Sequence, residues 1–288
     1  MREFTIITDS SCDLPIEIIE SHNIKVIPMS VIFDDVSYKH HYDYRELSAL
    51  DMYNGMRAGK IGRTAGTNVE DAINIMRPEL EAGRDIICLS LSSGISCAYQ
   101  NACLAAEDLR EEYPDAKIEV IDTKCASIGV GLMAYIAAKM KESVESFEIM
   151  VNYLRYECQN VFHYFVVDDL SYLQRSGRIS HLASMFGSML NIKPILTIGE
   201  DGKIYNESKV RGKKAAINSI VDKAIESCKD PSIFCIIHAD ALEDAKKIEE
   251  RLRERYPEAE IIISYVGPIA GINVGPGTFS IIGLGKER

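Results

Sequence analysis

The chain has 288 residues, of which 47% are hydrophobic, so it can bury the core of two domains or of one large α/β domain. Its formal net charge of −11 argues against a general nucleic-acid-binding protein, because no large basic surface is available to neutralise phosphates. The cysteines show no C-x-x-C spacing, which is typical of reduced, buried thiols in a cytosolic protein. The first residues are typical of a strand rather than a signal peptide, and glycines and prolines interrupt the apolar stretch 261–285. We therefore expect a cytoplasmic protein without a membrane segment.

Residues 1–160 are expected to form an N-terminal α/β domain, because short apolar strands alternate with helical segments. This alternation favours a mostly parallel, Rossmann-like sheet with helices on both faces. In such sheets, ligands bind beyond the carboxyl ends of the strands. The strands are predicted at Phe4–Thr8, Ile24–Phe33, Asp85–Leu89 and Lys117–Ile121, and the main helices at Asp43–Ala58, Tyr99–Leu109, Ala126–Met140 and Ser146–Cys158, with a loop at Gly59–Thr67.

Residues 161–288 are expected to form a C-terminal α+β domain with a mixed sheet. Glu200-Asp-Gly202 lies between two β-rich runs and is a strong hairpin signal. No low-complexity linker separates the two parts, so we expect them to pack closely. Strands are also predicted at Val161–Val167, Ile233–Ile237, Ile261–Val266 and Thr278–Ile282, and helices at His181–Leu190, Gly212–Cys228 and Ala241–Tyr256.

The segment Leu89–Gln100 joins a buried strand to a helix and carries Ser92, Ser93 and Ser96. The N-terminus of a helix presents unpaired backbone N–H groups and the positive end of the helix dipole, which can hold a phosphate or a carboxylate. An ordinary serine N-cap is the structural alternative. A small-molecule hydrolase or phosphotransferase that uses Asp9, Ser93 and Ser96 is the enzymatic alternative.

Other catalytic and metal-binding motifs are missing. The sequence has no P-loop, no G-x-S-x-G motif and no metal-ligand spacing among its histidines, so we expect no metal and no cofactor. The glycine-rich segment Gly271–Gly277 either approaches a ligand closely or is only a tight strand connection. Its sole polar side chain is Asn273, which needs a hydrogen-bonding partner.

Taken together, the ordered motifs resemble the DegV family of bacterial proteins over essentially the whole chain. The resemblance rests on Thr8-Asp9-Ser10, Thr64, Leu91–Ser96 with Tyr99-Gln100, Val120–Thr123, Phe165–Ile179, Asn191–Leu196, Asp201-Gly202, Lys209–Gly212 and Gly275–Gly277. It implies a two-domain α/β protein that binds a long-chain fatty acid in a tunnel and performs no chemistry alone. On the family pattern, the hydroxyls of Thr64 and Ser96 hold the carboxylate, with Ser93 adjacent. A separate ATP-binding fatty acid kinase subunit then phosphorylates the carboxylate for phospholipid synthesis, and this role is compatible with transient membrane contact.

The chain departs from the family pattern around the ligand head group. Asn273 stands where the family usually has histidine, Thr64-Ala-Gly-Thr67 replaces Thr-Ser-Gln-Pro, and Ser96-Cys-Ala98 replaces Ser-Gly-Thr. An asparagine amide can still donate to a carboxylate, but it does not titrate near neutral pH.

Basic residues are the candidates for the partner surface. We expect Arg175, Arg178, Lys209 and Arg211 to face the kinase subunit or its nucleotide, because an otherwise acidic chain retains them. Solvated charges with local ion pairs are the alternative.

Overall fold

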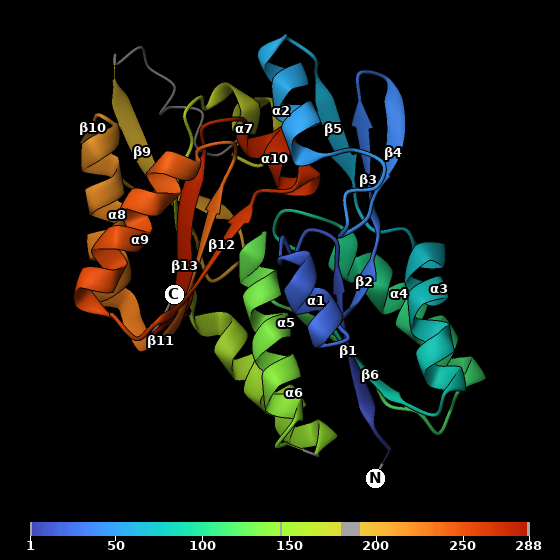
Figure 1. Ribbon diagram of the computed structural model, residues 1–288. Helices are drawn as coiled ribbons and strands as arrows, with labels where there is room; N and C mark the ends of the chain where they lie inside the picture. Colours follow the sequence, from blue (N-terminus) through green and yellow to red (C-terminus); the bar gives the residue numbers. More distant parts are fainter. Residues whose placement is uncertain (1, 145, 180–190, 287–288) are drawn as a thin grey trace.

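The computed structural model describes residues 2–144, 146–179 and 191–286, which form three sheets and the helices packed on them (Figure 1). The predicted helix at residues 181–190 lies outside the described residues. The short helices α1 (Ile16–Ser21), α7 (Ser171–Ser176) and α10 (Pro268–Val274) and the 3-10 turn η1 (Cys158–Asn160) connect the larger elements.

Sheet A is parallel throughout and has the strand order β2-β1-β6-β7. Its strands are β1 (Phe4–Asp9), β2 (Lys25–Ile27), β6 (Asp85–Ser90) and β7 (Ile118–Asp122). Every residue of β1 and β6 is buried, because helices cover both faces of the sheet. Helices α3 (Val69–Glu81) and α4 (Ala98–Glu112) pack on one face, and α5 (Ile128–Lys141) and α6 (Phe147–Glu157) pack on the other. The predicted parallel sheet is confirmed.

Sheet B is a small antiparallel sheet that the sequence did not predict. It has the order β4-β3-β5 and consists of β3 (Met29–Phe33), β4 (Val36–His40) and β5 (Gly62–Ala65). Asp34 and Asp35 form its hairpin turn with φ of +53° and +61°, a conformation that asparagine and glycine signal more clearly than two aspartates do. The predicted loop at 59–67 therefore contains a strand. Helix α2 (Ala49–Arg57) begins later than expected, because Ser48 caps it: Ser48 Oγ accepts from Asp51 N.

Sheet C is mixed, as predicted, and has the order β10-β9-β8-β13-β11-β12. Among the described strands of this sheet, β11 and β12 are parallel neighbours and the other pairs are antiparallel. The β9–β10 hairpin turns at the predicted Asp201-Gly202. Helices α8 (Lys213–Ser227) and α9 (Leu242–Arg255) cover one face of the sheet. The strands are β8 (Val161–Val166), β9 (Ile192–Ile198), β10 (Ile204–Arg211), β11 (Cys228–His238), β12 (Glu260–Tyr265) and β13 (Phe279–Gly285).

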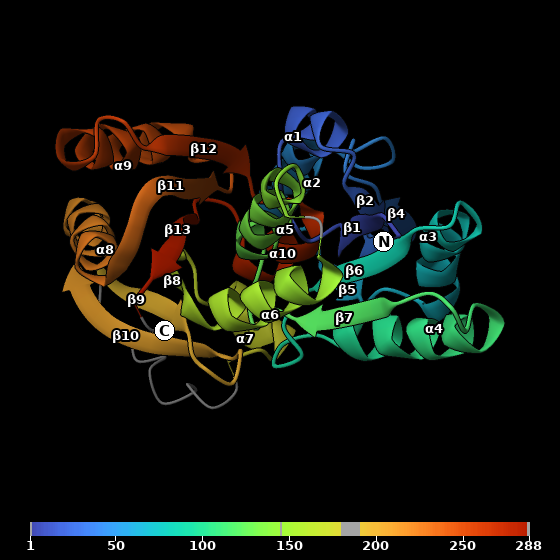
Figure 2. The ribbon, with the colours of Figure 1, turned by 90° about the horizontal axis from the view of Figure 1, so that it is seen from below.

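Helix α5 lies between sheets A and C and joins the two halves of the chain (Figure 2). Ten of its residues are buried, because one side packs on sheet A and the other on sheet C. Gly129 faces the His163 ring of β8, and Gly131 faces the backbone carbonyl of Cys12, so both neighbours approach the helix too closely for a side chain. The largest apolar core therefore runs from Phe4 to Leu284 across the expected boundary at residue 160.

Candidate functional site

A cavity of about 360 Å³ lies where the carboxyl edge of sheet A meets sheet C and α10. Most of its wall is apolar, and β8, β9, β11, β13 and α10 each contribute side chains to it. Its polar lining residues include Thr64, Ser96, Asn273 and Arg178, which are far apart in the sequence. An apolar cavity with a few converging polar groups is the ordinary form of a small-molecule site.

Three of the four predicted ligand-binding residues line this cavity, and we refer to Thr64, Ser96 and Asn273 as the head-group triad. Thr64 lies on β5, opposite Val31 of β3, and not on a loop. Ser96 Oγ accepts from the backbone N–H of Ala98 at 3.2 Å, so its hydroxyl hydrogen can be donated to a ligand. Asn273 Nδ2 donates to the carbonyl of Ile269 at 2.7 Å, and the second hydrogen of that amide can be donated elsewhere.

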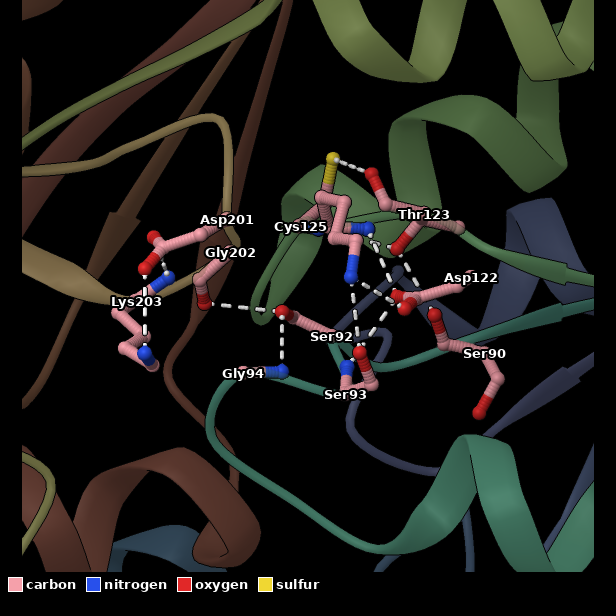
Figure 3. Close-up of polar contacts among 11 residues, drawn as sticks. Ser90, Ser92, Ser93, Gly94, Asp122, Thr123, Cys125, Asp201, Gly202 and Lys203 are labelled. Carbon is pink, nitrogen blue, oxygen red and sulfur yellow. Dashed lines mark hydrogen bonds and ion pairs between the residues drawn. The ribbon is translucent and has the colours of Figure 1, made fainter.

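Ser93, the fourth predicted residue, does not line the cavity. Its backbone N–H donates to Asp122 Oδ1 at 3.1 Å, and its hydroxyl accepts from Lys124 Nζ at 2.9 Å (Figure 3). Lys124 also forms an ion pair with Asp122 at 2.7 Å. Burial works in the opposite direction, but the Lys124 and Ser93 contacts hold the pKa of Asp122 below its ordinary value. Ser93 therefore anchors the loop, while its neighbour Ser96 faces the cavity.

The loop between β6 and α4 is clamped against the hairpin turn of sheet C (Figure 3). The fully buried Ser92 donates its hydroxyl to the carbonyl of Gly202 at 2.8 Å, and the same oxygen accepts from Gly94 N at 3.0 Å. A Cβ on Gly94 would come within 2.7 Å of Asp201 O, so the two backbones touch only because Gly94 has no side chain. This contact sets the position of Ser96 relative to sheet C.

Asp9 organises the edge of sheet A from within the core. Its carboxylate accepts from Leu91 N at 2.8 Å, from Ser90 Oγ at 3.2 Å, and from the backbone and side chain of Ser11. Burial raises the pKa of Asp9 although these hydrogen bonds act to lower it. Ser93 and Ser96 both line the adjoining groove, but the buried Asp9 lines neither that groove nor the cavity, so the structure does not bring all three side chains together at one pocket.

The four predicted partner-facing residues lie in different places. Arg178 lines the cavity and also an adjoining polar groove with Lys203 and Tyr205. Arg175 is exposed and stacks on the Tyr172 ring at 4.9 Å. Lys209 and Arg211 are exposed at the far end of β10, and Arg211 is separated from the cavity-lining residue Ile204 by about 20 Å of strand. Of these four side chains, Arg178 is therefore the one beside the head-group triad.

A buried polar cluster lies behind the cavity wall. Ser127, which lines the cavity, donates its hydroxyl to Asp13, and Asp13 also accepts from Gly267 N at 3.0 Å. Burial raises the pKa of Asp13 to about 7 and lowers the pKa of His40, which also lies beside Gly267, to about 4. Both groups are therefore uncharged over a wider pH range than is usual for their residue types.

Sequence analysis missed the polar residues in the depth of the cavity. His163 and Ser280 line it from β8 and β13 and are only 3% and 4% exposed. The available signal is a single polar residue within an otherwise apolar strand, as in Val161-Phe-His-Tyr-Phe165. That pattern does not reveal which face of the strand meets a cavity.

Among residues 2–144, 146–179 and 191–286, no group of three His, Cys, Asp or Glu side chains lies close enough to hold a metal ion. Over the same ranges, every helix is too short or too polar to cross a membrane.

Residues 3–286 match the family model DegV, whose description reads "Uncharacterised protein, DegV family". A DegV domain-containing protein of Clostridium perfringens is 34% identical over 291 residues, which cover 100% of this chain and 99% of the relative. The chain belongs to the DegV family. Similar solved DegV structures include a DegV family protein from Thermus thermophilus, described as fatty acid binding, with a TM-score of 0.89 and 26% identity, covering 99% of this chain and 100% of that chain.

Two further similar structures are also described by their ligands. DegV from Bacillus subtilis, a fatty acid binding protein, has a TM-score of 0.85 and 30% identity, covering 99% of this chain and 100% of that chain. A stearic acid-binding protein from Eubacterium ventriosum has a TM-score of 0.84 and 26% identity, covering 97% of this chain and 98% of that chain. The DegV fold of these relatives thus accommodates fatty acids.

Proposed function

We propose that this DegV protein binds a long-chain fatty acid in the cavity, with its carboxylate at the head-group triad. The proposal depends on one observation: neutral hydrogen-bond donors from β5, the β6–α4 loop and α10 line the same apolar cavity. Hydroxyl and amide donors satisfy a carboxylate, while the apolar wall removes the hydrocarbon chain from water. Relatives of the same fold that are described as fatty acid binding support this assignment.

Arg178 adds a positive charge to the same site. It lines both the cavity and the adjoining groove, so it lies where the carboxylate end of the ligand would meet solvent. Guanidinium–carboxylate pairs are strong when they are partly desolvated. We therefore assign Arg178 to the head group, in addition to its expected role toward a partner.

The second part of the proposal concerns the fate of the bound acid. We propose that the protein acts in the cytoplasm without catalysis of its own and presents the carboxylate to an ATP-binding kinase subunit, which forms the acyl phosphate. The open groove lined by Ser93, Arg178, Lys203 and Tyr205 supports this, because it adjoins the triad and leaves room for a second molecule. The buried position of Asp9 is a reason to prefer presentation over hydrolysis by the protein itself.

Titration of the purified protein with oleic acid tests the binding proposal. The Thr64→Val and Ser96→Ala variants should each bind about tenfold more weakly, since each removes one hydrogen bond to a charged group. Ser93→Ala is the matched control and should retain affinity, because Ser93 lies outside the cavity. Native mass spectrometry that finds a co-purifying nucleotide or metal and no acyl chain would contradict the proposal and favour the enzyme alternative.

A further inference from the structure

The wall that sheet C contributes to the cavity contains two polar side chains among apolar ones. His163 and Phe165 are two positions apart on β8, and Ser280 and Ile282 are two positions apart on β13, so each pair shares one face of its strand. In the antiparallel register, His163 lies opposite Ile282 and Phe165 lies opposite Ser280. The imidazole and the hydroxyl are therefore diagonal neighbours on the face that meets the cavity, close enough to reach one ligand group.

Along β13, Ser280 and the position opposite His163 lie progressively further from the end of α10 that carries Asn273. Strand β13 begins shortly after Asn273, so position along the strand measures distance from that end. Thr278, Ser280 and Ile282 all line the cavity, and the step from Thr278 to Ile282 is about 13 Å. Ser280, and His163 opposite Ile282, consequently lie alongside the middle of a bound chain rather than its carboxylate.

Both side chains make a hydrogen bond that fixes them in the wall. Ser280 Oγ donates to the carbonyl of Tyr164 at 3.1 Å, so its oxygen can accept from a ligand. His163 Nε2 accepts from the backbone N–H of Ala126, just before α5, at 3.3 Å. A plain hydrocarbon placed against this surface would leave the acceptor capacity of Ser280 Oγ unused, whereas a ligand hydroxyl would use it.

We propose that the cavity prefers a fatty acid that carries a hydroxyl group partway along its chain. This inference rests on the proposed function, since it places the carboxylate at the head-group triad. A hydroxyl group on the ligand both donates and accepts, so it can donate to Ser280 Oγ while it lies beside the His163 ring. Sites built to hydrogen-bond a ligand hydroxyl discriminate against the analogue that lacks it.

Oleic acid and ricinoleic acid form a suitable probe pair, because they differ only by one mid-chain hydroxyl. The native protein should bind ricinoleic acid about tenfold more tightly, which corresponds to about 1.4 kcal/mol. Ser280→Ala and His163→Leu should each reduce this preference while keeping affinity for oleic acid, which also reports that the variant is folded. Ser227→Ala is the matched control, because its hydroxyl contacts the Tyr164 side chain from outside the cavity lining. That variant should keep the full preference.

The possible outcomes separate this inference from the proposed function. If the native protein binds oleic acid as tightly as ricinoleic acid, or more tightly, the inference is overturned and fatty acid binding stands. The same holds if the preference survives in both Ser280→Ala and His163→Leu. If the native protein binds neither acid, the proposed function fails and the inference falls with it.

Discussion

Replacement of Gly202 by alanine tests whether the hairpin of sheet C holds the head-group loop in place. Gly202 has a φ of +75°, a region in which an L side chain costs about 1 kcal/mol. A Cβ there would also overlap with Ser92 Oγ, which donates to the Gly202 carbonyl and accepts from Gly94 N. The substitution therefore combines backbone strain with the loss of one buried and one partly buried hydrogen bond.

The expected loss of stability follows from these two contributions. Each hydrogen bond contributes about 1 kcal/mol, so Gly202→Ala should lower the free energy of unfolding by about 3 kcal/mol when the strain is included. Gly83 provides the matched control, because its φ is +79° and a Cβ there would meet no heavy atom within 4 Å. Gly83→Ala should cost about 1 kcal/mol, the strain alone. The difference between the two variants isolates the contact between the loop and the hairpin.

Urea unfolding at neutral pH measures both variants, and oleic acid titration measures the effect on the site. Gly202→Ala should also weaken oleic acid binding, since the clamp positions Ser96, whereas Gly83→Ala should leave it unchanged. Adding Ser92→Ala to Gly202→Ala should restore part of the stability by removing the overlap. If Gly202→Ala and Gly83→Ala lowered the free energy of unfolding equally, the reasoning would be refuted, because the hairpin would then accommodate the added Cβ without losing stability.

Three further predictions concern titration, the head group and the partner. The raised pKa of Asp13 means that the folded protein holds this proton more tightly than the unfolded chain, so its contribution to stability falls as the pH rises from about 3.8 to about 7. Asp13→Asn should therefore gain stability relative to the native protein across that window in urea unfolding. If the free energies of unfolding of the two proteins changed with pH in the same way, the raised pKa of Asp13 would be contradicted. His40, whose pKa is lowered, titrates in both proteins and so does not contribute to their difference. Asn273→His should change oleic acid affinity less than tenfold, and a larger change, above about 1.4 kcal/mol, would show that the asparagine is tuned to another ligand. Arg178→Glu should weaken oleic acid binding at least tenfold. Arg211→Glu should leave oleic acid binding intact but slow kinase-dependent turnover. If turnover is unchanged, Arg211 does not belong to the partner surface.

Local patterns were sufficient for the elements that depend on neighbouring residues. The alternation of apolar strands and helices predicted sheets A and C, because burial on one or both faces imposes a period along the chain itself. The Asp201-Gly202 turn was predicted for the same reason, since a residue with positive φ favours glycine regardless of the surrounding fold. Sheet B was missed because its turn, Asp34-Asp35, adopts that conformation without glycine.

Residue types and motif order determined that the chain is a DegV protein and that hydroxyls gather at a sheet edge. Only the tertiary structure decided which hydroxyls face the cavity. Ser93 and Ser96 are three positions apart on one loop, yet Asp122 and Lys124 hold the first outside the cavity while the second lines it. The polar pair His163 and Ser280 was equally hidden, because cavity walls and cores use the same apolar strands. Pairing between distant segments creates such a cavity, and no local pattern in the chain encodes that pairing.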